Sequence, residues 1–145
     1  MTSIDFHFNT PDRLEYACRL TRKIVNAGQA NAAAPLVVFC QDEDRLQQFD
    51  DLLWQFSPTD FIPHVRATDP LAKDTPVLLT ADDARLPVHH LLLNLDDAPP
   101  PFFSRYVRLL EVVSLLDDDK LKARERFTFY RDRGYAMTRH DLSKT

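Results

Sequence analysis

Glycine is scarce in this sequence: two of the 145 residues, Gly28 and Gly134, are glycine. A P-loop and a dinucleotide-binding turn each need several glycines close together, because the backbone has to approach a phosphate group closely. Neither motif is present. If the chain folds like a nucleotide-binding protein, we expect it to lack the usual phosphate cradle, and we predict no cofactor.

Cysteines are also few, and long apolar runs are absent. Cys18 and Cys40 do not show the paired spacing of a zinc or redox site, so we interpret both as buried, reduced thiols. No apolar run approaches the roughly 20 residues needed to span a bilayer, and the N-terminus has no basic start followed by an apolar signal segment. We therefore expect a cytoplasmic protein with no membrane association.

The charge balance is acidic. The chain has 18 lysines and arginines against 22 aspartates and glutamates, a formal net charge of −4. We therefore expect little direct binding of nucleic acid, and any anion has to bind at a local patch. A length of 145 residues, with 44% hydrophobic and 28% charged residues, is typical of a globular chain that folds as one domain, residues 1–145.

Short apolar runs alternate with helical patterns along the chain. Five runs predict strands, the first of them an edge strand: residues 4–8, 35–40, 76–80, 89–95 and 110–116. Helical patterns are found at residues 11–27, 41–54, around Phe102, and 117–133. Thr10 is expected to cap the first helix, and residues 57–76 are expected to be irregular. The alternation predicts a Rossmann-like, doubly wound α/β fold, with a mostly parallel sheet and helices on both faces.

The helix predicted at residues 117–133 gathers basic and aromatic side chains. Its basic positions are 120, 122, 124, 126, 131 and 133. At helical spacing Lys120, Arg124, Thr128 and Arg131 share a stripe, and Phe127 lies in an adjacent one. Such a groove suits a carboxylate-rich peptide, because a guanidinium group can bind a carboxylate with two hydrogen bonds. The alternative is an ordinary surface helix whose basic residues favour its negative end.

A second stretch, LLWQFSPTDFIPH at residues 52–64, is rich in aromatic side chains around a break at Pro58. Its large apolar side chains are Trp54, Phe56, Phe61 and Ile62. Aromatic residues at a helix end and in the loop that follows are typical of anchors in protein interfaces. The alternative is that these four side chains fill the core beneath a loop.

The sequence offers little for a metal site or for catalysis. His89 and His90 are adjacent and would point to opposite faces of a strand, so they cannot easily bind one metal ion. Asp96 and Asp97 follow a predicted strand, where α/β proteins bind ligands, so a nucleotide- or metal-binding enzyme remains the alternative function. A turn or helix cap is the other interpretation of this pair. We predict no catalytic residue and no metal ligand.

Two segments of the chain resemble the chi subunit family of bacterial DNA polymerase III. They are FCQDEDRLQQFDDLLW followed by FIPH, within residues 39–64, and KARERFTFYRDRGYAM, residues 122–137. The resemblance implies a Rossmann-like fold without nucleotide-binding activity, in a non-catalytic accessory subunit of the clamp-loader assembly. It also implies two partners: the psi subunit, and the acidic C-terminal tail of single-stranded DNA-binding protein, which ends in proline and phenylalanine.

The resemblance also implies which residues bind each partner. For the tail they are Leu116, Lys120, Arg124, Phe127, Thr128 and Arg131. Thr128 stands where some members of the family have lysine, so tail binding should be weaker or depend more on Arg131 or Lys120. For psi the residues are Trp54, Phe61 and Pro63, and the sequence leaves open whether a helicase shares that surface.

Overall fold

The computed structural model describes residues 1–55 and 61–144. In these ranges seven strands form one parallel sheet in the order β3-β4-β2-β5-β6-β1-β7. The strands are β1 (Ser3–Thr10), β2 (Leu36–Phe39), β3 (His64–Arg66), β4 (Val77–Thr80), β5 (Leu91–Asn94), β6 (Arg108–Ser114) and β7 (Met137–Asp141). The helices are α1 (Arg13–Asn26), α2 (Glu43–Gln55) and α3 (Asp117–Asp132), with short 3-10 turns at Ala72–Asp74, Phe103–Arg105 and Leu142–Lys144.

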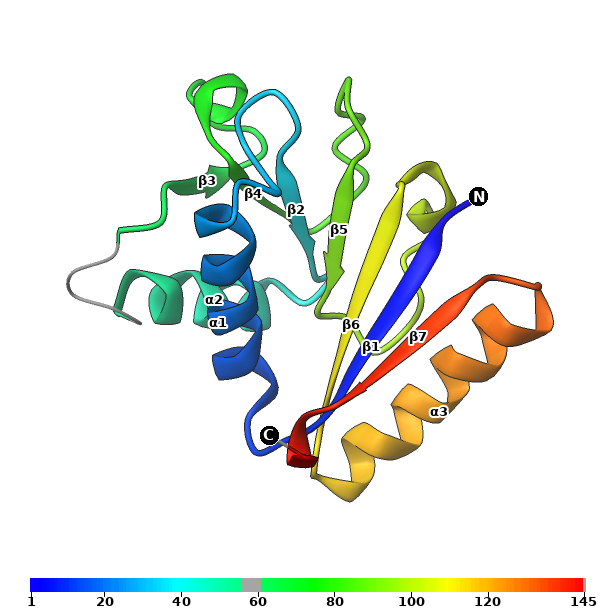
Figure 1. Cartoon of the computed structure of the whole chain (residues 1–145). Helices are drawn as coiled ribbons and strands as arrows, with labels where there is room; N and C mark the ends of the chain where they lie inside the picture. The colour runs from blue at the N-terminus through cyan, green and yellow to red at the C-terminus, as the bar shows by residue number, and fades with distance from the viewer. Residues whose placement is uncertain (56–60, 145) are drawn as a thin grey trace.

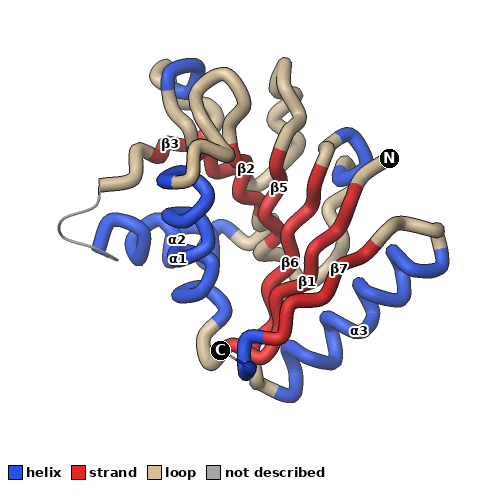
Figure 2. Tube along the Cα trace, in the orientation of Figure 1, coloured by secondary structure: helices blue, strands red, loops and turns tan. Residues whose placement is uncertain are grey.

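The helices cover the two faces of the sheet, as Figures 1 and 2 show. The side chains of α1 and α2 pack with one set of strand residues, and those of α3 pack with the other. In β6, for example, Leu110 and Val112 belong to the cluster with α1 and α2, whereas Leu109 and Val113 belong to the cluster with α3. Strands buried on both faces explain the continuous apolar runs. The Rossmann-like, doubly wound prediction is confirmed.

Two expectations about the N-terminal region are wrong. The first strand is not at an edge, because β1 lies between β6 and β7. Thr10 does not cap α1 but ends β1, and the N-cap is Asp12, whose carboxylate accepts a hydrogen bond from the Glu15 backbone N–H at 3.1 Å. Gly28 lies just past α1 with φ of 74°, a left-handed conformation that glycine adopts without strain.

Three further differences concern short elements. The strand β3 lies within the stretch expected to be irregular, and β7 was not predicted at all, because its sequence MTRHD has no apolar pattern. The helix expected around Phe102 is a single 3-10 turn. Prolines precede it, and Phe102 and Phe103 turn inward and are buried on the α3 side of the sheet.

Within the part of the chain that the structure describes, none of the helices is both long and apolar enough to span a membrane.

Candidate functional site

A buried polar cluster sets how α3 lies against the sheet. Glu111 and Arg126 are fully buried, and the Arg126 Nε donates to the Glu111 carboxylate at 3.1 Å. The same carboxylate accepts from the Tyr130 hydroxyl at 2.7 Å and from the Asn94 amide at 3.0 Å. Burial and the adjacent Glu111 raise the pKa of Tyr130, so its hydroxyl stays protonated as a donor. Arg126 and Tyr130 therefore face inward. Arg124 and Phe127 lie on another side of the helix, away from this cluster.

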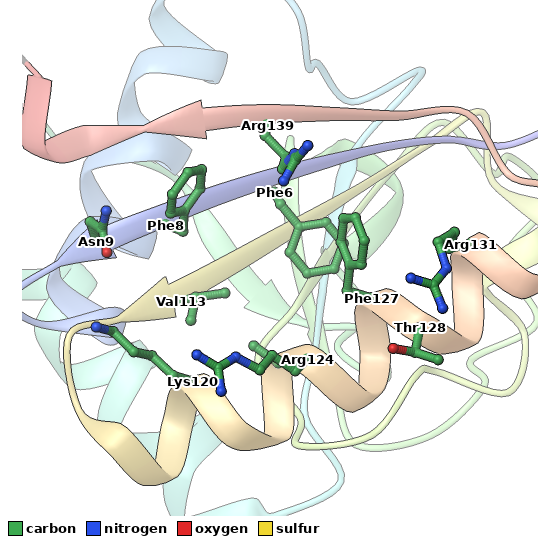
Figure 3. A pocket seen from close by; sticks show the side chains of 11 residues that line it. Phe6, Phe8, Asn9, Val113, Lys120, Arg124, Phe127, Thr128, Arg131 and Arg139 are labelled. Atoms are coloured by element: carbon green, nitrogen blue, oxygen red, sulfur yellow. The ribbon is translucent and has the colours of Figure 1, made fainter.

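The side of α3 that carries Arg124 and Phe127 faces a groove between this helix and the β1–β7 side of the sheet. The groove has a volume of about 530 Å³. We call it the α3 groove (Figure 3). It is lined by Phe6, Phe8, Asn9, Val113, Lys120, Ala123, Arg124, Phe127, Thr128, Arg131 and Arg139. The sheet supplies the first four and Arg139, and α3 supplies the others.

The charge of the α3 groove is of one sign. Lys120, Arg124, Arg131 and Arg139 are cations, and the described lining includes no carboxylate. Among the described residues, Arg124 and Lys120 form no side-chain ion pair or hydrogen bond, whereas Arg131 pairs with its neighbour Asp132 at 3.2 Å. The groove therefore presents free positive charge to an anion.

The interior of the α3 groove is apolar. The Phe127 ring meets the Phe6 ring edge-on, with centroids 5.4 Å apart. Arg139 lies over the Phe127 ring, with its guanidinium carbon 5.6 Å from the ring centroid. Phe8 and Val113 extend this apolar surface along the sheet (Figure 3). Rings flanked by guanidinium groups can hold an aromatic side chain and a carboxylate together.

The structure brings together five of the six residues assigned to the tail: Lys120, Arg124, Phe127, Thr128 and Arg131. Leu116 is not among the lining residues of the groove. It is the exposed N-cap of α3 and lines a neighbouring hollow of about 340 Å³. Sequence reasoning missed the lining residues of β1, β6 and β7. The alternating Phe6 and Phe8 were a signal for β1, but β7 offered none.

The second aromatic stretch is divided between core and surface. Trp54 and Phe61 are 56% and 62% exposed, with ring centroids 5.0 Å apart, and Pro63 is exposed beside them, whereas Ile62 is buried. Buried His64 lies 4.9 Å from the Trp54 ring and holds the chain here, through contacts of its ring nitrogens with the Ile62 carbonyl at 2.7 Å and the Asp50 carboxylate at 2.8 Å. We call Trp54, Phe61 and Pro63 the Trp54 surface. Phe56 and Pro58 lie outside the described residues.

Asp96 and Asp97 lie in a turn after β5. Asp96 accepts a hydrogen bond from the Asp97 backbone N–H at 3.0 Å. Asp97 binds Arg45 at 3.0 Å and Lys122 at 3.3 Å, with Arg13 at 3.7 Å. Partial burial acts to raise the pKa of Asp97, but Arg45 and Lys122 outweigh it and hold the pKa below its usual range. The carboxylate is thus neutralised by the protein's own cations, and no group of three or more metal-ligating side chains occurs among the described residues.

The remaining candidate residues are structural. His89 and His90 lie just before β5 and not within it, so the argument from opposite strand faces does not apply; the His89 ring packs on Tyr106 at 5.2 Å. Cys18 and Cys40 are fully buried free thiols, as expected. Burial raises the pKa of the Cys18 thiol to about 12, which makes it a poor nucleophile.

Comparison with known proteins gives one consistent result. Residues 1–138 match the family model described as DNA polymerase III chi subunit, HolC. The chain is 31% identical to DNA polymerase III subunit chi of Pseudomonas aeruginosa, over 99% of both chains. It is 27% identical to DNA polymerase III subunit chi of Haemophilus influenzae, over 88% of this chain and 86% of that one.

Proposed function

The chain belongs to the DNA polymerase III chi subunit family, and we propose that it is a non-catalytic adaptor with two binding surfaces. In this proposal the α3 groove binds the acidic C-terminal tail of single-stranded DNA-binding protein. The Trp54 surface binds the psi subunit, which connects the chain to the clamp loader. The protein would then tether the replicase to coated single strands in the cytoplasm.

The observation that carries the tail assignment is the combination of charge and shape in the α3 groove. Four cations surround an apolar hollow, and no carboxylate lines it in the described part of the chain. Acidic residues of the tail would bind the cations, while the terminal phenylalanine would enter the hollow. A net charge of −4 disfavours DNA phosphates over the rest of the surface, so the protein coating the strand is preferred to the strand itself.

The threonine at position 128 does not leave the groove short of positive charge. Thr128 is exposed at the rim, and Arg139 supplies a cation from β7 on the opposite wall. An acidic peptide between α3 and β7 would therefore meet guanidinium groups on both sides. In this proposal Arg139 supplies the positive charge that Thr128 does not.

Replacing Arg124 by Ala is expected to weaken binding of a synthetic acidic peptide ending in Pro-Phe by about ten- to hundredfold, because a charge-assisted hydrogen bond is lost. Isothermal titration at two salt concentrations measures this, and the wild-type affinity should fall as salt rises. Arg19→Ala is the matched control, since it removes an exposed arginine from α1 outside the groove. Equal affinity of the Arg124 and Arg19 variants would reject the groove as the tail site.

The observation that favours the Trp54 surface is the exposure of a paired Trp and Phe. Large exposed rings that pack against each other at a tilted angle, and are backed by a buried His64, form a preorganised apolar surface. Such surfaces carry much of the energy in protein interfaces. The Trp54 surface lies at the end of α2 and just beyond it, whereas the groove lies along α3 on the other face of the sheet, so the two partners can bind at the same time.

Replacing Trp54 by Ala is expected to weaken psi binding by about thirtyfold or more while tail-peptide affinity stays unchanged. Co-purification with psi and titration of the tail peptide on the same preparation measure both effects. Val107→Ala serves as the control, because Val107 is 57% exposed but lies just before β6, away from the aromatic pair. Undiminished co-purification of psi with the Trp54 variant would remove the assignment of this surface.

A further inference from the structure

Among the described strands β7 lies at the edge of the sheet, so one row of its backbone groups has no neighbouring strand there. It is the last strand of the sheet, and Figures 1 and 2 show it as the outermost one, with α3 running along it. The Ile4 backbone N–H donates to the Ala136 carbonyl at 2.9 Å, so position 136 faces β1. Backbone groups alternate sides along a strand, so Thr138 and His140 also face β1. The N–H and C=O groups of Met137 and Arg139 therefore point outward from the sheet.

The outward backbone groups and the α3 groove share a residue. Arg139 pairs in register with Phe6 on β1, and both side chains line the groove. The Arg139 side chain thus reaches into the groove while its backbone N–H and C=O face the open edge. A peptide chain placed along β7 would send every second side chain toward the face that carries the groove.

The two edges of the sheet differ in the contacts that their arginine side chains make. At the opposite edge, Arg66 of β3 donates to Glu43 at 2.9 Å and to Gln47 at 3.3 Å. The Arg139 side chain on β7, by contrast, forms no ion pair or hydrogen bond with the described residues, and its guanidinium group lies over the Phe127 ring. A free guanidinium beside open backbone groups suits an acidic segment, and it repels a basic one.

We infer that the free edge of β7 binds an acidic peptide as an added strand, through the backbone of Met137 and Arg139. This inference rests on the proposed function: the added strand is formed by the acidic residues that precede the terminal phenylalanine of the tail. The phenylalanine occupies the hollow beside Phe127, and the residues before it run along β7. Backbone hydrogen bonds then add affinity that does not depend on the exact order of acidic side chains.

Amide hydrogen exchange of the full-length protein, measured by NMR with and without the acidic Pro-Phe peptide, tests this inference. We expect exchange at the Met137 and Arg139 amides to slow by about tenfold or more at saturating peptide. The Thr138 and His140 amides, already bonded to β1, should change less. The Arg66 amide provides the matched control, since the Ala67 N–H donates to Leu79 of β4 and Arg66 therefore faces the distant open edge.

A second measurement uses peptides that carry a single backbone N-methyl group. If the peptide binds as an added strand, N-methylation of every second residue, whose N–H bonds to β7, is expected to weaken binding by about tenfold. N-methylation of the residues between them, whose N–H groups point away from β7, is expected to have little effect. If the unmodified peptide binds, but exchange at Met137 and Arg139 is unchanged and no methylation pattern appears, the added strand is wrong and the groove assignment stands. If the unmodified peptide does not bind, the proposed function fails, and this inference fails with it.

Discussion

Replacing Arg126 by Ala is expected to lower the free energy of unfolding by about 3–5 kcal/mol, the typical cost of removing one partner of a buried ion pair. Arg126 and Glu111 are both inaccessible to solvent, and their side chains are joined at 3.1 Å. Without the guanidinium, the Glu111 carboxylate keeps donors from Tyr130 and Asn94 but loses its ion-pair partner. The Asp97 carbonyl also loses a donor at 3.0 Å.

Urea unfolding followed by circular dichroism measures this loss. Arg124→Ala is the matched control, because it removes the same side chain two residues earlier on α3, where it is exposed. Its effect on stability should stay within about 0.5 kcal/mol, as for other surface substitutions. The pair of variants therefore separates two roles of arginine on one helix: Arg124 acts in binding and Arg126 in folding. Equal stability of the two variants would contradict the structural role assigned to the buried pair.

The strands and helices that the sequence predicts correctly are those with strong local patterns. The continuous apolar runs of β2 and β4 indicate strands buried on both faces, and both are interior strands of the sheet, with α1 and α2 packed on one face. The spacing of Leu46, Phe49 and Leu53 defines α2, and all three are buried. The Rossmann-like architecture follows from the alternation of such elements. Membership of the chi family follows from the comparisons with known proteins.

The elements that could not be predicted depend on distant partners. The β7 sequence MTRHD is polar, and it forms a strand because β1 offers a backbone edge, not because its side chains are buried. In the same way, the basic positions of α3 look alike in the sequence. Arg126 differs from Arg124 because Glu111, on another element, faces it from the sheet. The sequence can therefore place a cationic, aromatic helix here, but not the second wall of the groove.

Replacing Phe6 by Ala is expected to destabilise the protein by about 3–5 kcal/mol and to weaken binding of the tail peptide as well. Phe6 is only 4% exposed, and its ring contacts Phe127 at 5.4 Å and Tyr130 at 6.0 Å. Removing it leaves a cavity beneath α3 and takes away the surface against which Phe127 rests. The hollow proposed for the terminal phenylalanine then loses an apolar side chain that lines it.

Phe8→Ala is the control that separates these two effects. Phe8 lies two residues further along β1, on the same face and in the same groove, but it is only half-buried. Its loss should cost clearly less stability, because less apolar surface is removed from contact with the core. Denaturant unfolding and peptide titration on both variants give the comparison. A loss of stability for the Phe6 variant no greater than that for the Phe8 variant would show that β1 does not support α3 through this ring, and the link between core packing and tail binding would then be wrong.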